Sequence, residues 1–293
     1  DPDGAFDLIR SRVLGYVDVV CTALGAGLLD RQRKPGCSII GSTGMHMRLA
    51  ETPDDVQLNE AATGYTMAMP APGVFAQMQS NMAATLNIDW VLGLASGILA
   101  SQGITRSNGE MIALVDAWIA ASEPASLLYQ PYVSEAGERG PFVDANARAG
   151  FVGISSRHGY ADLVRAVFEG LAFAARDCYA AMGPLPREVR LTGGAARSPA
   201  LRKILGAALG ADIRTSAREE AGAAGAAMIA AVSVGLYKSM DECVGEWVTP
   251  LLGEAEPSDR NLAAIYDKMT PSYMLAHQAL RPVWRAMAAS QAN

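Results

Sequence analysis

The sequence predicts an α/β fold in which a mixed β-sheet is flanked by helices. Residues 36–49 read as two strands joined by a short turn, and residues 64–79 read as two more around a Pro-Gly turn. From residue 126 onward, strand-like stretches alternate with helical ones, as in layered α/β domains. Alanine and glycine are abundant and aromatic residues make up only 6% of the chain, a composition that suits helices packed closely on a sheet.

Composition excludes several classes of protein. A chain of 293 residues is long enough for one large domain or two with a substantial core. Its net charge of −6, without any run of Lys or Arg, argues against a nucleic-acid partner. No apolar run is long enough to span a bilayer, and the first residues do not resemble a signal peptide, so we expect no membrane partner. The four cysteines are far apart, which argues against a disulfide framework or zinc site and favours a reducing cytoplasm.

Five stretches have helical spacing of apolar residues. The first, at 13–30, carries Asp18 near its start, where an acid is commonly favoured by the helix dipole alone. A buried helix is expected around Trp90, and further helices are expected at 109–122, 160–182 and 219–236. The glycines of 219–236 indicate close approach to the sheet or to a ligand. A helical tail at 257–291 is expected to break at Pro271 and Pro282.

Two glycine-containing turns are candidate phosphate sites. In residues 189–210 a short strand leads into Gly193 and Gly194, and Ser198 caps the helix that follows, with Pro199 at its first position. Such a turn brings backbone N–H groups and a helix N-terminus together, which suits a nucleotide, but an ordinary βα turn has the same sequence features. Residues 41–44, GSTG, have the composition of a phosphate cradle and equally that of a plain hairpin turn. Neither a P-loop nor a GxGxxG motif is present.

The remaining polar residues are less specific. A charged, glycine-rich loop follows residue 133 and contains Glu138 and Arg139, which either serve function or form an internal ion pair that orders the loop. The three histidines, His46, His158 and His277, have no evident catalytic partner and are interpreted as structural or solvated.

Several motifs in order resemble the FGGY family of carbohydrate kinases. Residues 149–169, AGFVGISSRHGYADLVRAVFE, resemble the second signature of that family, and residues 137–150 resemble its GERxP…RG loop. Downstream, residues 191–213 resemble its adenosine-binding segment and residues 219–231 the helix that follows. The resemblance covers nearly the whole chain.

The resemblance implies the fold and the domain organisation. FGGY kinases have two actin-like ATPase domains with a ribonuclease-H-like core, and the second holds most of the ATP. We expect residues 1–33 to be the end of the N-terminal domain and the interdomain hinge, and residues 34–293 to be the nucleotide-binding C-terminal domain. The chain has no D-x-G-T loop of the kind with which the family begins, so we expect the N-terminal kinase domain to be a missing partner.

The resemblance also implies roles for individual residues. Residues 15–18 resemble the GGxD motif, whose aspartate, here Asp18, is the general base; Tyr16 departs from the usual glycine. The hairpin at 41–44 resembles the family's phosphate hairpin with Ser and Thr exchanged. Thr85 falls near a position by the γ-phosphate. The cofactors implied are ATP and Mg²⁺, with no protein metal ligand nominated. The residues expected to bind the nucleotide are Gly41, Ser42, Thr43, Thr85, Gly193, Gly194 and Ser198.

The predicted function is ATP-dependent phosphorylation of a hydroxyl group of a small sugar or polyol. Residues 15–28 and 89–95 are similar to the erythritol and L-xylulose branch of the family, and erythritol is the preferred substrate. The alternatives are a kinase for a ketopentose such as xylulose, and a nucleotide-binding regulatory module without chemistry of its own. We expect the 293-residue chain to bind ATP weakly and to be inactive alone; a homodimer is left open.

Overall fold

The computed structural model describes residues 16–291. Its main sheet has six strands in the order β3-β4-β2-β1-β7-β8. The pairs β1–β7 and β7–β8 are parallel, whereas β1–β2, β2–β4 and β3–β4 are antiparallel, so the predicted mixed sheet is confirmed. The strands are β1 (Gly36–Ile40), β2 (Gly44–Ala50), β3 (Tyr65–Ala68), β4 (Phe75–Asn81), β7 (Glu188–Thr192) and β8 (Asp212–Thr215). A small second sheet pairs β5 (Leu128–Gln130) with β6 (Gly150–Val152).

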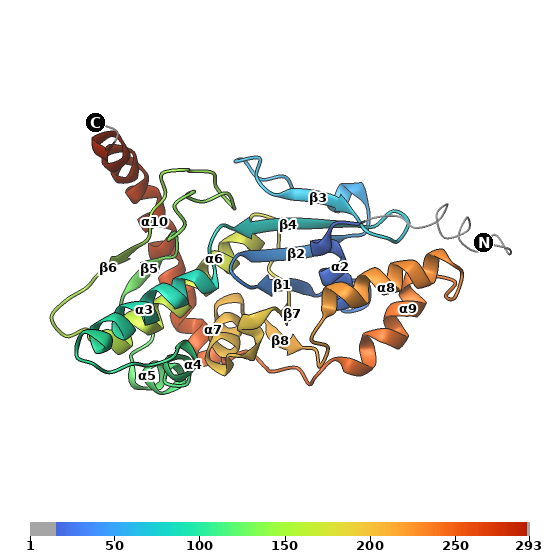
Figure 1. Cartoon of the computed structure of the whole chain (residues 1–293). Coiled ribbons are helices and arrows are strands. Elements are labelled where there is room, and N and C mark those ends of the chain that lie inside the picture. The colour runs from blue at the N-terminus through green and yellow to red at the C-terminus, as the bar shows by residue number, and fades with distance from the viewer. Residues whose placement is uncertain (1–15, 292–293) are drawn as a thin grey trace.

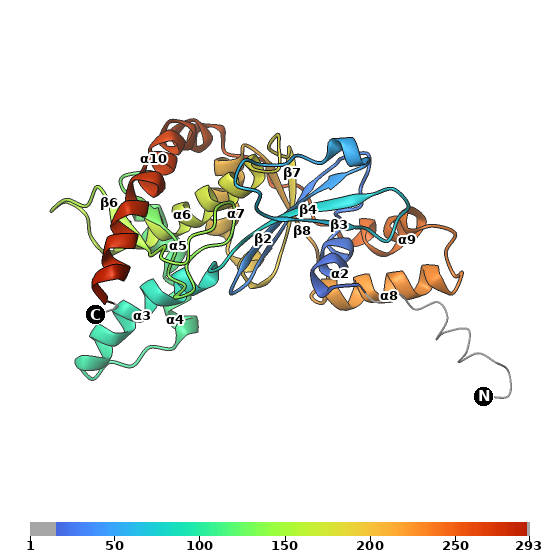
Figure 2. The same cartoon turned by 90° about the horizontal axis from the view of Figure 1, so that it is seen from above.

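Helices cover both faces of the main sheet (Figures 1 and 2). One apolar core contains residues of α2 (Asp18–Gly25), α8 (Ala221–Ser233) and α9 (Met240–Trp247). The other core lies between the sheet and the remaining helices. These are α3 (Thr85–Ser101), α4 (Asn108–Ile112), α5 (Val115–Ala121), α6 (Tyr160–Ala180), α7 (Pro199–Leu209) and α10 (Arg260–Gln291).

Two expectations about the helices were wrong, and a third is made more specific by the structure. The stretch at 109–122 forms two short helices, α4 and α5, instead of one. Helix α3 is half-buried: Ile88, Val91 and Leu92 face the core, whereas Trp90 is 40% exposed. The glycines of α8 have a packing reason, but they pack against helix α2 and not against the sheet. Gly225 packs on the carbonyl of Cys21 in α2, and Gly25 of α2 packs on the carbonyl of Ala221, so a Cβ at either position would collide with backbone.

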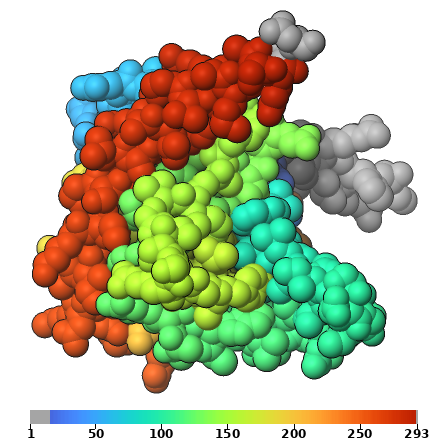
Figure 3. Space-filling view, turned by 90° about the vertical axis from the view of Figure 1, so that its left-hand side faces the viewer, coloured from blue at the N-terminus to red at the C-terminus, as the bar shows by residue number. Residues whose placement is uncertain are grey.

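The C-terminal helix also differs from expectation. Helix α10 continues through both Pro271 and Pro282 and runs along the side of the molecule seen in Figure 3. A proline inside a helix removes one backbone hydrogen bond, and its ring clashes with the carbonyl of the residue four positions earlier. Here the buried residues lie on either side of each proline, so tertiary packing offsets the local cost. They are Leu262, Tyr266, Tyr273, His277 and Trp284.

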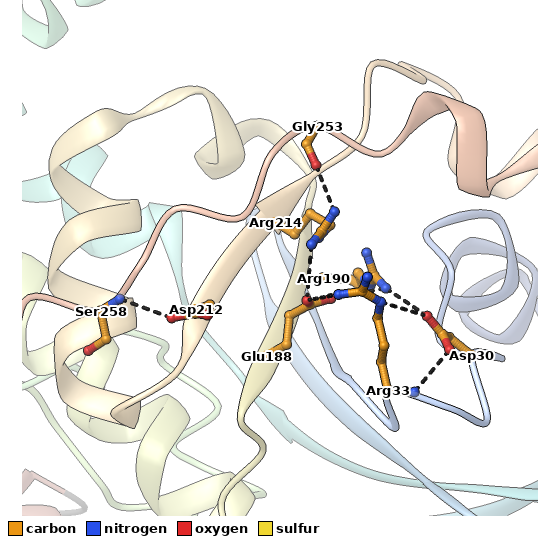
Figure 4. A network of polar contacts seen from close by, with 8 residues as sticks. All are labelled: Asp30, Arg33, Glu188, Arg190, Asp212, Arg214, Gly253 and Ser258. Carbon is orange, nitrogen blue, oxygen red and sulfur yellow. Dashed lines mark hydrogen bonds and ion pairs between the residues drawn. The ribbon is translucent and has the colours of Figure 1, made fainter.

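The N-terminal end of β7 holds a buried ion network (Figure 4). Arg190 is 1% exposed and its guanidinium lies 3.0 Å from both Asp30 and Glu188. Arg214 on β8 approaches Glu188 at 3.4 Å. Burial lowers the pKa of Arg190, and its acidic neighbours oppose that effect. This network lies at the opposite end of β7 from the Gly193-Gly194 turn. We therefore assign its charged residues a structural role and not a role in that turn.

Candidate active site

The Gly193-Gly194 turn has the local structure that its sequence predicts. Gly193 has φ 92° and ψ 177°, a conformation that is open almost only to glycine. A Cβ there would lie 2.6 Å from the carbonyl oxygen of Ile40 at the end of β1. The Ser198 hydroxyl accepts a hydrogen bond from the Leu201 amide at 3.2 Å, and Pro199 follows at the start of α7. The turn therefore packs directly on the backbone of β1, and only glycine fits at position 193. The predicted Ser198 cap of α7 is confirmed.

The hairpin between β1 and β2 is held against the start of α3. The amide of Ala84 donates to the Ser42 carbonyl at 2.7 Å, and the amide of Thr85 donates to the Gly41 carbonyl at 2.9 Å. Within residues 16–291, the hydroxyls of Ser42, Thr43 and Thr85 make no hydrogen bond and remain able to donate to a ligand. The structure thus brings Thr85 to the predicted phosphate hairpin, 42 residues away in sequence.

Two pockets meet at the glycine turn. One, of about 510 Å³, lies between α3, α5 and the start of α7. The other, of about 380 Å³, lies between the ends of β7 and β8. Both include Gly194 and Arg197 in their walls. No neighbouring atom lies within 4 Å of a Cβ built at Gly194 or at Gly41, so both glycines face open space. A pocket of this size, with backbone N–H groups at its rim, fits a nucleotide.

Two helix N-termini converge on the larger pocket. Thr85 begins α3, of 17 residues, and Pro199 begins α7, of 11 residues, and both residues line the pocket. The positive dipole ends of the two helices favour an anion there. Arg197 adds a full positive charge. The end of the pocket at these two helix starts and Arg197 therefore suits phosphates, whereas Asp89 and Asp116 add negative charge elsewhere in its wall.

The walls of the larger pocket include apolar residues that sequence reasoning missed. Ile88, Ile112, Val115 and Phe168 line it, together with Asp89 and Asp116. Ile88 and Asp89 lie three and four residues after Thr85 and so share one face of α3. That periodicity is visible in the sequence, but only the packing of α3 and α5 against the glycine turn shows which face meets the pocket.

Asp18 is not brought to these pockets. It is exposed at the first position of α2, where its carboxylate accepts a hydrogen bond from the Val19 amide at 2.8 Å. Among the hydrogen bonds of residues 16–291, none joins it to the hairpin or the glycine turn. Tyr16, two residues earlier, lines a separate pocket of about 450 Å³ with the turn between β3 and β4. That turn lies at the far end of the sheet from the hairpin, because Phe75 pairs with Ala50 and Asn81 with Gly44. Gly15, the first residue of the GGxD-like motif, lies outside the described residues.

The charged loop between β5 and β6 is ordered without an ion pair between Glu138 and Arg139. Glu138 is 3% exposed and accepts from the amides of Met82 and Arg139 at 2.9 and 2.8 Å. The guanidinium of Arg139 instead donates to the Ser80 hydroxyl at 2.9 Å. Glu138 therefore joins this loop to the segment between β4 and α3.

The two buried histidines are structural, as expected. His46 lies 3.0 Å from the Ser38 hydroxyl and 3.3 Å from the Asn81 side-chain oxygen. Burial lowers its pKa to about 4, against the opposing hydrogen bond to Asn81. His277 stacks on Phe142 with ring centroids 4.9 Å apart, and burial lowers its pKa to about 4 as well. All four cysteines are free and buried. Among residues 16–291, no helix is long and apolar enough to cross a membrane.

Known structures share this architecture. A ligand-bound xylulose kinase from Lactobacillus acidophilus matches with a TM-score of 0.77 at 20% sequence identity, covering 91% of this chain and 51% of that chain. A xylulose kinase from Rhodospirillum rubrum matches with a TM-score of 0.75 at 25% identity, covering 92% and 52%. The predicted actin-like ATPase fold is confirmed by these matches.

Sequence comparison agrees with the structural matches. The chain is 55% identical over 278 residues to an erythritol kinase from Brucella abortus (strain 2308), covering 95% of this chain and 53% of that relative. It spans about half the length of the curated relatives it matches. The C-terminal domain of the FGGY family of carbohydrate kinases matches residues 36–234. This chain therefore belongs to the FGGY family of carbohydrate kinases.

Proposed function

We propose that this chain supplies the nucleotide-binding half of a kinase that transfers the γ-phosphoryl group of MgATP to a hydroxyl of erythritol. The observation that carries the proposal is the convergence of the 41–44 hairpin, Thr85 and the Gly193-Gly194 turn beside a pocket of about 510 Å³. The 55% identity to an erythritol kinase supports the choice of substrate. Residues 1–33 are proposed to lead out of a first domain, and residues 34–293 to form the second.

The proposed roles follow the chemistry of phosphoryl transfer. The hydroxyl oxygen of the polyol attacks the γ-phosphorus, the bond from phosphorus to the bridging oxygen breaks, and ADP leaves. The resemblance of residues 15–18 to the GGxD motif supports Asp18 as the acceptor of the hydroxyl proton, a role that requires it to reach the γ-phosphate from the start of α2, outside both pockets. The hydroxyls of Ser42, Thr43 and Thr85 and the amides of Gly193 and Gly194 orient the phosphates, while Ser198 borders the adenosine. Catalysis of this kind rests on positioning and on electrostatic stabilisation by the protein and Mg²⁺.

Two other functions have specific support. Xylulose kinases such as that of Staphylococcus epidermidis are 27% identical to this chain over 244 residues, which supports a ketopentose as substrate. The distance of Asp18 from the pockets along the sheet supports a nucleotide-binding module without chemistry of its own. We further place the protein in the cytoplasm, where ATP is available and four free cysteines stay reduced. A homodimer stays a prediction that sedimentation tests.

The first test is binding and turnover by the chain itself. We expect calorimetry to show weak MgATP binding and no ADP release with erythritol. Joining the chain to the part of the Brucella abortus erythritol kinase outside the matched region should restore turnover. A panel of erythritol, xylulose and glycerol then identifies the substrate, and preference for xylulose would replace erythritol in the proposal. Absence of any MgATP binding would refute the nucleotide site.

The second test concerns the base. In the joined protein, Asp18→Asn should lower kcat at least about 1,000-fold while the Kd for MgATP stays within about twofold. Asp54→Asn, which changes an exposed aspartate in another first helical turn, is the matched control and should leave both quantities unchanged. A normal kcat in Asp18→Asn would refute the role of Asp18 and favour another residue as base.

A further inference from the structure

Glu138 is a buried carboxylate that serves as a backbone acceptor. It lies in the loop between β5 and β6, and one of its oxygens, Oε1, accepts from the amides of Met82, Arg139 and Gly140 at 2.9, 2.8 and 3.4 Å. The loop is closed by a pair of backbone hydrogen bonds between Glu138 and Asp144, both 3.0 Å long. A carboxylate with 3% exposure is costly to bury unless it is well hydrogen-bonded, so its position is closely defined.

The loop that carries Glu138 packs against the C-terminal end of β4. Asn81 donates from its side-chain nitrogen to the Gly140 carbonyl at 2.8 Å. Gly140 lies so close that a Cβ there would be 2.6 Å from the Ser80 carbonyl oxygen. Arg139 adds the hydrogen bond to the Ser80 hydroxyl described above. The loop and the last residues of β4 therefore form one packed unit.

Met82 connects that unit to the phosphate hairpin. Two residues after Met82, Ala84 donates to the Ser42 carbonyl, and the next residue, Thr85, donates to the Gly41 carbonyl. Only Ala83 thus separates the amide held by Glu138 from the amides of Ala84 and Thr85, which hold the hairpin. Glu138 itself lines neither of the two pockets that meet at the glycine turn, so it does not act by touching the nucleotide.

We propose that Glu138 is a positioning residue that holds residues 82–85, and through them the 41–44 hairpin, in the geometry that binds the phosphates of MgATP. The inference rests on the proposed function, because it assumes that the hairpin binds phosphate. The chemistry requires an acceptor oxygen at the place of Oε1, and a carboxylate is the strongest acceptor for three amide donors.

The test compares three variants of the chain. Glu138→Ala removes the acceptor and should raise the hydrogen-exchange rate of the amides of residues 82–85 and weaken the Kd for MgATP, each about tenfold. Glu138→Gln keeps an oxygen in the same place and should lose only about threefold in each. The matched control is Asp144→Asn, which neutralises the other buried carboxyl of the same loop, whose side chain accepts from the Asn146 amide at 2.9 Å. It should change neither quantity.

The outcomes separate this inference from the proposed function. If the wild type binds MgATP and Glu138→Ala binds it equally well, or if exchange at 82–85 is unchanged, the positioning role is overturned. If the wild type does not bind MgATP at all, the proposed function is the part that fails. Should Glu138→Ala not fold, Glu138→Gln decides: unchanged exchange and unchanged Kd in that variant overturn the proposal.

Discussion

The sharpest prediction concerns the two neighbouring glycines of the turn that is proposed to bind the nucleotide. Gly193→Ala places a Cβ on a residue with φ 92° and ψ 177°, which costs about 1–3 kcal/mol in backbone strain. The same Cβ would lie 2.6 Å from the oxygen, 2.9 Å from the carbon and 3.1 Å from the nitrogen of Ile40. These are backbone atoms of β1, which pairs with β2 on one side and β7 on the other, so they cannot move without disturbing the sheet.

We therefore expect Gly193→Ala to lower the free energy of unfolding by about 3 kcal/mol or more, a large part of the total stability of a typical domain. Gly194→Ala is the matched control. Its Cβ would have no atom within 4 Å, so its stability should stay within about 1 kcal/mol of the wild type. The new methyl group would nevertheless project into the space between the two pockets, and the Kd for MgATP should weaken about tenfold.

Urea unfolding followed by tryptophan fluorescence measures the first effect, and calorimetric titration with MgATP measures the second. The two variants should differ in which quantity changes. Gly193→Ala should lose stability, whereas Gly194→Ala should lose affinity for MgATP while staying folded. A Gly193→Ala protein as stable as the wild type would refute the backbone reasoning. A Gly194→Ala protein that binds MgATP normally would refute the placement of the nucleotide beside this turn.

Two further predictions concern packing and pH. Gly225→Ala should lower the free energy of unfolding by about 3 kcal/mol, because its Cβ would collide with the Cys21 carbonyl. Gly93→Ala meets open space in α3 and should raise the free energy of unfolding by up to about 1 kcal/mol. Equal urea midpoints of the two variants would contradict this. Burial raises the pKa of Asp177 to about 7, so the stability that this carboxyl contributes is present at low pH and lost as the pH rises through 7. The unfolding free energy of Asp177→Asn relative to wild type should therefore increase by roughly 2–3 kcal/mol from pH 5 to pH 8, and a constant difference would refute the shift.

Features that depend on neighbours in sequence were predicted correctly. The Ser198 cap, the Gly193 turn and the hairpin at 41–44 each follow from residue types a few positions apart. They form because hydrogen-bond donors, glycine conformations and turn geometry act within a few residues. The resemblance of several such segments, taken in order, was sufficient to identify the family.

Features that depend on packing were predicted less well. The two prolines of α10 do not break it, because buried residues on both sides hold the helix to the core. The glycines of α8 serve a helix–helix contact with α2 that no local pattern distinguishes from contact with a sheet. In each case the competing energies come from residues far away in sequence, which propensity does not include.

For this protein, the sequence by itself determined the glycine turns, the helix cap, the mixed sheet and the family. Only the tertiary structure decided that Thr85 meets the hairpin, that α3 and α5 wall the larger pocket beside the glycine turn, and that Glu138 accepts from the Met82 amide while the Arg139 guanidinium donates to Ser80. It also leaves Asp18 at the first turn of α2, away from the pockets. The reason is physical: a turn is defined by the torsion angles of its own residues, whereas a pocket is defined by which helix faces the packing of the sheet brings together.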